Sequence, residues 1–284
     1  MEDLSYYQQE LHKIHEWEKD QADMWFWEKL GRIPFQLLDK ITPKIVHEYL
    51  GKFLDELGSY IQTGGQYLIK HQDVLDRLQE KSDYPEKLTI EKVRDLPLAT
   101  MNELSEEYKK SRKQIATLQG ATTGFGGIFT LAVDIPVLLG LSLKVLQEMA
   151  ITYGYDPTDQ AERIFIVKCL QFSSSDYNGK QSILKELTGS TEEASESISR
   201  LQGWREVIMT YRDNYGWKKL FQIVPVIGIL FGAIINRFTV DEVAEAGQML
   251  YRKRRVLSKI RALEEVKARR ALLEQFNEDQ HPQK

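Results

Sequence analysis

Apolar residues recur every three or four positions along most of the chain, which is the period of an amphipathic α-helix. The alternation of single apolar and polar residues that is typical of a half-buried strand does not persist over a useful length. The pattern therefore predicts an all-α fold, a multi-helix bundle of roughly nine or ten helices. The clearest apolar stripes are Val46, Leu50, Phe53, Leu57 and Tyr60, then Leu98, Met101, Leu104, Tyr108, Ile115 and Leu118, and finally Leu257, Ile260, Leu263 and Val266.

Residues with capping preferences predict where several helices begin and end. A first helix rich in Tyr and Trp is expected from Leu4 to Gly31, with its aromatic face docked on the bundle or, alternatively, at a membrane interface. Tyr153-Gly154 is expected to end another helix. The expected helix starts are Thr42-Pro43, whose helix ends at Gly64-Gly65, Thr158, and the capping boxes Ser190 with Glu193 and Thr239 with Glu242.

The polar stretch from Lys70 to Pro97 interrupts the apolar stripes and is expected to be a connector. The predicted organisation is an N-terminal helical region with this connector over residues 1–97, an all-α domain over 98–276, and a disordered tail over 277–284. The chain has 284 residues, which is enough for a hydrophobic core without disulfides or metals.

Two segments carry almost no charge, although 28% of the residues in the chain are charged. The first, from Gln114 to Leu143, contains only Asp134, and the second, from Leu220 to Asn236, contains no charged residue. We expect these segments to be shielded from water, either at the centre of the bundle or in contact with lipid. Neither reaches about 18 uninterrupted apolar residues, so a simple membrane-spanning anchor is not expected.

Both segments contain glycines four positions apart, Gly120 with Gly124 and Gly228 with Gly232. Each pair presents a bare helix face, which predicts close helix–helix contact of the kind found in membranes and in tight soluble cores. No Gly-Lys-Ser/Thr follows the run from Gly120 to Gly127, and a helical pattern precedes it. The run is therefore neither a P-loop nor a dinucleotide-binding fingerprint.

Asp134 is followed by Ile-Pro136, which predicts that Asp134 caps a helix with the proline in its first turn. A turn at Asp134 makes the first segment a helical hairpin, buried in the bundle or re-entrant in a membrane. Asn236 is expected to be a polar cap or a buried hydrogen-bond partner of that turn. In an alternative interpretation, Asp134 is an acid in apolar surroundings with a raised pKa and a functional role.

Charge is unevenly distributed, although the formal net charge of −4 gives no reason to expect nucleic acid as a partner. Residues 1–30 contain eight acidic and three basic residues, whereas residues 252–270 contain nine basic and two acidic ones. We expect the two helices to pair, or alternatively the basic side chains to contact anionic lipid head groups. The candidates for head-group contact are Lys109, Lys110, Arg112, Lys113, Lys218, Lys219, Arg252, Lys253, Arg254 and Arg255.

The remaining chemistry is sparse. Cys169 is the only cysteine and lies in an apolar run, so it is expected to be a buried, inert thiol in a reducing compartment. No secretory signal is visible and the mean hydropathy is −0.41, which favours a cytoplasmic protein, with membrane association as an additional expectation. His12 and His15 have no further ligands nearby, and no catalytic motif is present, so no metal, cofactor or catalytic residue is assigned.

The order and spacing of these elements resemble the EcsC protein family over roughly residues 95–265. The resemblance implies a mostly bacterial family, named for a protein encoded beside an ABC transporter and linked to membrane processes, without agreed catalytic residues. The motif positions lie in the runs Gly-Ala-Thr-Thr-Gly-Phe-Gly-Gly, Asp-Ile-Pro, Ala-Ile-Thr-Tyr-Gly-Tyr-Asp and Ile-Val-Pro-Val-Ile-Gly. They are Gly120, Gly124, Gly126, Gly127, Asp134, Pro136, Tyr153, Gly154, Pro225, Gly228, Gly232 and Asn236.

Three functional hypotheses follow from the sequence. The first is a non-enzymatic protein, peripheral to the membrane and accessory to a transporter or an envelope process. The second is a soluble bundle whose apolar core binds a lipid-like ligand or a protein partner. The third is a hydrolase that uses Asp134, for which the sequence shows no partner nucleophile or base. The sequence does not predict the oligomeric state.

Overall fold

The computed structural model describes residues 2–21, 60, 68–123, 131–175, 177–188 and 229–280. Every regular element among these residues is a helix, so the prediction of an all-α fold is confirmed for the described part of the chain. The helices are α1 (Leu4–Asp20), α5 (His71–Lys81), α6 (Ile90–Val93), α7 (Leu98–Thr123), α8 (Leu131–Thr152), α9 (Gln160–Ser174), α10 (Tyr177–Thr188) and α14 (Ile229–Gln280).

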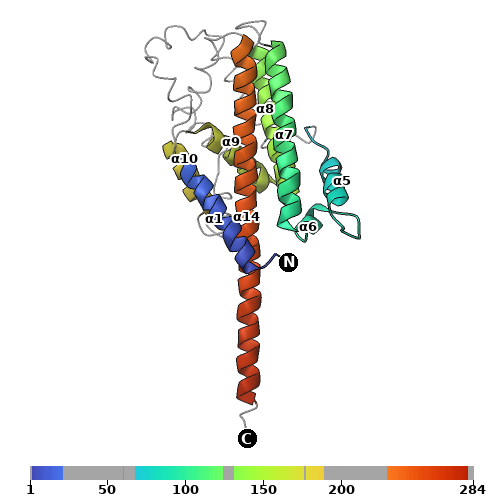
Figure 1. The fold of residues 1–284 in the computed structure, drawn as a ribbon, viewed down its shortest axis with the longest axis vertical. Coiled ribbons are helices and arrows are strands. Elements are labelled where there is room, and N and C mark those ends of the chain that lie inside the picture. The colour runs from blue at the N-terminus through green and yellow to red at the C-terminus, as the bar shows by residue number, and fades with distance from the viewer. Residues whose placement is uncertain are drawn as a thin grey trace.

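The long helix α14 organises the bundle (Figure 1). It packs against α7, α8, α9 and α1, and α7 and α8 also pack against each other. Lys109 and Lys113 of α7 pair with Glu245 and Asp241 of α14, so these two helices run antiparallel. The C-terminal part of α14 projects beyond the other helices (Figure 1), and its side chains from Arg261 to Leu273 are largely exposed.

The core is built from aliphatic and aromatic side chains of all these helices. On α7, the expected stripe is buried over Leu98, Met101, Leu104 and Tyr108. The same stripe is exposed farther along the helix, at Ile115 and Leu118, whereas Ala116 between them is buried. Cys169 is buried as expected, and burial raises the pKa of its thiol well above the ordinary value. A thiol held neutral in this way is a packing group and not a nucleophile.

One glycine sets the distance between α8 and α14. A Cβ added at Gly247 would lie 2.6 Å from Cδ2 of Leu146 and 3.5 Å from Cγ of Met149, and both of those side chains are fully buried. The two helices therefore approach closely because this position has no side chain. The close contacts expected at Gly120 with Gly124 and at Gly228 with Gly232 stay predictions, and the contact at Gly247 is an additional one.

The stretch expected to be a polar connector contains two helices that pack against the bundle. Helices α5 and α6 lie within it and contact α7 and α8, and Leu78, Leu88, Val93 and Leu96 are buried. The side-chain amide of Gln79 organises the intervening loop, because its Nε2 donates to Tyr84 O at 2.7 Å and its Oε1 accepts from Leu88 N at 2.8 Å. The apolar residues here are too widely spaced to give a continuous stripe in the sequence.

Several predicted helix ends need correction. The first helix ends at Asp20 rather than Gly31, and its N-cap is Asp3, whose Oδ1 accepts from Tyr6 N at 2.9 Å. Helix α9 is capped by Asp159 rather than Thr158. Thr239 and Glu242 form no capping box, because α14 begins ten residues before Thr239. The same helix continues to Gln280, so the tail expected to be disordered from residue 277 is helical over 277–280. The expected caps at Thr42-Pro43, Gly64-Gly65 and Ser190 with Glu193 lie outside the described residues.

Candidate functional site

The motif pair Tyr153-Gly154 ends α8, as predicted. Gly154 has a φ of +79°, which is the left-handed conformation that glycine adopts without a steric penalty. Gly154 N donates to Ile151 O and Tyr155 N donates to Ala150 O, each at 2.9 Å, which is the hydrogen-bond pattern of a Schellman C-cap. A Cβ at Gly154 would also lie 2.9 Å from Nη2 of Arg255. The glycine is therefore required for the fold of this helix end.

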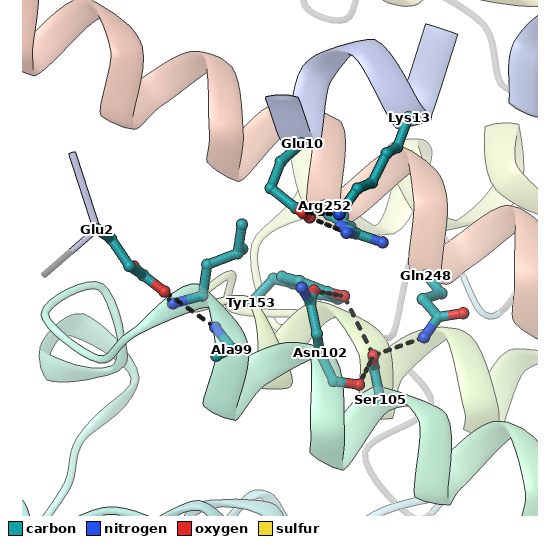
Figure 2. Close-up of polar contacts among 10 residues, drawn as sticks. Glu2, Glu10, Lys13, Ala99, Asn102, Ser105, Tyr153, Gln248 and Arg252 are labelled. Carbon is teal, nitrogen blue, oxygen red and sulfur yellow. Dashed lines mark hydrogen bonds and ion pairs between the residues drawn. The ribbon is translucent and has the colours of Figure 1, made fainter. Parts of the chain in front are cut away.

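Tyr153 belongs to a buried polar network between α7, α8 and α14 (Figure 2). Its hydroxyl donates to Asn102 Oδ1 at 2.9 Å and lies 3.1 Å from Ser105 Oγ. Ser105 Oγ donates to the carbonyl of Asn102 at 2.8 Å and accepts from Gln248 Nε2 at 2.9 Å. Burial raises the pKa of the Tyr153 hydroxyl, so it stays a neutral donor. The network joins three helices at one height, and its hydrogen-bonding groups are satisfied within the protein.

The basic run from Arg252 to Arg255 on α14 packs against the neighbouring helices. Arg252 pairs with Glu10 (Figure 2), and Lys253 pairs with Glu18. The acidic first helix and the basic last helix therefore pair with each other, as expected. Arg254 pairs with Glu162 of α9 at 2.8 Å. These partners already use the positive charges that were candidates for lipid head-group contact.

Arg254 and Arg255 also pack on aromatic rings. The guanidinium of Arg254 lies over the rings of Tyr155 and Phe165, with its carbon 4.0 and 4.1 Å from the two ring centroids. Arg255 is buried, and burial lowers its pKa. Both side chains therefore act in packing the middle of α14, where Arg255 is buried and Arg254 is one-third exposed.

The basic residues of α7 are paired in the same way. Lys109 pairs with Glu245 at 3.4 Å, Lys113 pairs with Asp241, and the guanidinium of Arg112 binds the buried carboxylate of Glu148, with Nε 2.8 Å from Oε2. Lys110 is the exposed member of this group, 3.7 Å from Glu106. The internal pairs hold α7 against α8 and α14, which leaves Lys110 as the α7 candidate for contact with an anionic surface. Lys218 and Lys219 lie outside the described residues.

Asp134 is the fourth residue of α8, so the expected N-cap is wrong. The helix already begins at Leu131, and Pro136 falls in its second turn. The chain does form a helical hairpin, because α7 and α8 pack together, but the connection lies between Thr123 and Leu131 rather than at Asp134. Asn236 lies within α14, so it does not cap a helix.

The structure describes the backbone of two further motif glycines. Gly120 lies in the last two turns of α7, and Gly232 lies in the first turn of α14. The other motif glycines and one proline lie outside the described residues; these are Gly124, Gly126, Gly127, Pro225 and Gly228.

One end of the α7–α8–α14 bundle exposes large apolar side chains. They are Leu118 (70% exposed) and Ile115 (38%) on α7, Val137 (41%) on α8 and Phe238 (42%) on α14. The pair Lys113–Asp241 fixes the register of α7 and α14, so Leu118 and Phe238 both lie about one turn beyond that pair. We call these four residues the apolar end. It lies at the upper end of the bundle in Figure 1, where α7 ends and α8 and α14 begin.

The chain carries few charged residues at this end of the bundle. On α7 the last charged residue is Lys113, and the next charged residue along the chain is Asp134. On α14 the exposed Arg237 stands directly before Phe238. Among the described residues, no helix is both long enough and apolar enough to cross a membrane. The apolar end is therefore a surface feature formed by three helix ends.

Comparison with known proteins agrees with this architecture. The family model of the EcsC protein family matches residues 8–256, and the chain belongs to this family. The match begins much earlier than the sequence motifs indicated, since it includes α1, α5 and α6.

Two curated proteins of Bacillus subtilis are similar to the chain. A protein named "Uncharacterized protein YdbA" is 53% identical over 260 residues, covering 90% of this chain and 95% of that protein. "Protein EcsC" is 32% identical over 159 residues, covering 56% of this chain and 65% of that protein. No solved structure matches the chain.

The sequence reasoning missed two of the four residues of the apolar end and misassigned the others. Ile115 and Leu118 were expected to continue the apolar stripe of this helix. Periodicity alone does not show which turns of a helix are covered by other parts of the protein. Val137 and Phe238 were not singled out. Phe238 follows Asn236-Arg237 at the boundary of the second charge-poor segment, and this position was the signal available in the sequence.

Proposed function

We propose that the protein binds peripherally to a membrane surface through the apolar end, and that it serves a membrane or envelope process such as transport in a binding role. The observation that carries this proposal is the exposure of Leu118, Ile115, Val137 and Phe238 from three helices at one end of the bundle. Clustered exposed apolar side chains are typical of surfaces that contact a protein partner or a membrane. The charge-poor sequence around them favours lipid, because a bilayer penalises charge far more than a protein surface does.

Magnitudes indicate which interaction dominates. Complete transfer of a large apolar side chain out of water is worth about 1.5–3 kcal/mol. An exposed basic residue near an anionic membrane contributes about 1 kcal/mol. Since most basic candidates are paired inside the fold, Arg237 and Lys110 are the described exposed cations nearest the apolar end. We therefore expect apolar contact to supply most of the affinity and anionic lipid to add a smaller, salt-sensitive part.

Flotation of the purified protein with liposomes tests this proposal. Neutral and anionic vesicles are compared at low and high salt, using the wild-type chain and the double variant Leu118→Ser with Phe238→Ser. Both positions are exposed, so the variant keeps the fold while losing two apolar contacts. We expect binding of the wild type to anionic vesicles, a few-fold weakening in high salt, and a loss of at least about tenfold in the variant.

A matched control uses apolar residues that are equally exposed elsewhere. Leu272 and Leu273 are 62% and 57% exposed on the projecting part of α14, away from the apolar end. The double variant Leu272→Ser with Leu273→Ser is expected to bind vesicles as the wild type does. Absence of wild-type binding under every condition, or an equal loss in both double variants, contradicts the proposal.

A further inference from the structure

A pocket of about 180 Å³ opens between four helices about one turn along α14 from the apolar end, since Glu242 in its lining follows Phe238 by four residues. Its walls come from α1, α9, α10 and α14, and the role proposed for the apolar end does not involve it. Among the described residues, those in the lining with charged or aromatic side chains are Trp17, Asp20, Phe172, Lys180, Glu242 and Glu245. The pocket thus combines three carboxyl groups, one amine and two aromatic rings.

The charges in this pocket do not balance. Glu245 accepts from Trp17 Nε1 at 2.9 Å and pairs with Lys109 of α7 at 3.4 Å, so its charge is already compensated. Lys180 donates to Gln21 Oε1 at 2.8 Å and lies over the ring of Phe172, 5.4 Å from its centroid. Against the single positive charge of Lys180, the carboxyl groups of Asp20 and Glu242 remain.

The raised pKa of Glu242 is consistent with this excess of negative charge. Burial raises its pKa to about 8; Lys180 lowers it, and the negative charges of Glu245 and Asp241 raise it further. Asp241 is itself paired with Lys113 of α7, and α9 contributes only the uncharged Phe172 and Ser173 to the lining. Even with Lys180 nearby, the site therefore holds a proton on Glu242 at neutral pH, where an additional cation would instead allow the carboxylate to ionise.

The size and the walls of the pocket select the kind of cation. A cavity of about 150 Å³ holds one benzene molecule, so about 180 Å³ accommodates roughly six to eight non-hydrogen atoms. The rings of Trp17 and Phe172 pack against each other, 5.5 Å apart at an angle of 35°, and Phe172 already has the ammonium group of Lys180 over its face, as expected from the attraction of aromatic faces for cations. In the described part of the chain, no three carboxylate, histidine or cysteine residues lie close enough together to hold a metal ion.

We propose that this pocket binds a small organic ammonium ion, with Asp20 and Glu242 as its counter-charges and Trp17 and Phe172 as its aromatic walls. The ligand class comprises primary and quaternary amines of up to about eight non-hydrogen atoms. No sequence pattern indicates this site, because its residues come from four helices that are far apart along the chain.

Binding of such a cation is linked to a proton. The ammonium ion favours the ionised form of Glu242, so the carboxyl group loses its proton when the ligand enters. Below a pKa of about 8, affinity should therefore rise by about tenfold for each unit of pH, and above it the affinity should level off. Choline is the most informative probe, because a quaternary ammonium has no proton of its own to lose.

The experiment is isothermal titration calorimetry of the full chain with choline between about pH 6 and pH 9, in buffers that differ in ionisation enthalpy. Ethanolamine and putrescine serve as primary-amine probes. The test variant is Glu242→Gln, which is neutral at every pH and matches the size of the protonated acid. The control is Glu264→Gln, which removes one charge from an exposed position on the same helix.

The expected result is release of about one proton per choline bound near pH 6.5, with the pH profile given above. Above pH 8 the Glu242→Gln variant should bind choline at least about tenfold more weakly, and Glu264→Gln should bind as the wild type does. No binding of choline, ethanolamine or putrescine up to about 10 mM overturns the proposal. Binding without proton release, or binding that Glu242→Gln leaves unchanged, also overturns it. The proton-release measurement needs only the wild-type chain, so it decides the matter even where a variant folds poorly.

Discussion

The middle of the α7–α8–α14 bundle and its apolar end are built on the same three helices but differ in their content of charged side chains. In the middle, Lys109, Arg112 and Lys113 each pair with a carboxylate of a neighbouring helix. Within two turns of Lys113, the same α7 helix exposes Ile115 and Leu118. Positively charged side chains in the middle of the bundle therefore mainly hold the helices together, whereas the end of the bundle presents an apolar surface.

The largest effect is expected from breaking a charge pair in the packed region. Arg254→Met leaves the buried carboxylate of Glu162 with Tyr251 as its remaining donor, at 2.6 Å. An uncompensated buried charge is costly, so we expect a loss of about 3 kcal/mol in the free energy of unfolding, measured by urea denaturation. A loss below about 0.5 kcal/mol would show that this pair does not hold α14 against α9.

Alanine substitution at two glycines should change the stability by a smaller amount, and with opposite signs at the two positions. Gly247→Ala pushes a methyl group against the buried Leu146, so we expect destabilisation by about 1 kcal/mol. At Gly140 of α8, an added Cβ meets nothing within 4 Å, so Gly140→Ala should stabilise the helix by about 0.5–1 kcal/mol. Thermal unfolding of the two variants measures the contrast, and a stabilising Gly247→Ala would show that α8 and α14 are not closely packed there.

The pH dependence of stability tests the packed region in another way. Because the pKa of Glu242 is raised from its ordinary value of 4.5 to about 8, the folded protein holds a proton that the unfolded chain has lost between these values. Stability from this group is therefore complete below about pH 4.5 and is lost as the pH rises through about 8. Since Glu242 is partly exposed, we expect Glu242→Gln to be more stable than the wild type by only about 1–2 kcal/mol at pH 9. Urea denaturation at pH 6 and pH 9 measures this, and parallel pH profiles of the two proteins would contradict the raised pKa.

The smallest effect on stability is expected at the apolar end. Leu118→Ser removes a side chain that is 70% exposed, so the free energy of unfolding should change by no more than about 0.5 kcal/mol. Leu104→Ser, on the same helix but fully buried, should lose several times as much. Comparable losses in the two variants would show that Leu118 is part of the core, and the comparison between the two regions would fail.

Parts of the site could be predicted from the sequence and parts could not. Tyr153-Gly154 was identified because a glycine directly after the last turn of a helix is a local signal: the helix end needs a residue with positive φ, which glycine adopts readily. The pairing of α1 with α14 was identified because opposite net charges on two helices are visible in the sequence. Asp134 was misplaced because a capping residue and an acid in the second half of the first helical turn give the same local pattern, Asp-x-Pro.

Glu242 shows the limit most clearly. In the sequence it completes an apparent capping box with Thr239, whereas in the fold it lies inside a 52-residue helix and faces a pocket. Its surroundings come from Trp17, Phe172 and Lys180, which only the packing of α1, α9 and α10 against α14 brings together. No local pattern carries that information.

The helical fold class, the family, the glycine end of α8 and the division between charged and charge-poor segments can all be recognised from the amino-acid sequence. Each of these depends on neighbouring residues or on periodicity within one helix. Only the tertiary structure decided which basic residues are paired, which part of the α7 stripe is exposed, and which carboxyl group keeps its proton. These properties depend on side chains from other helices, and burial and electrostatic interaction are set by distance in space and not by distance along the chain.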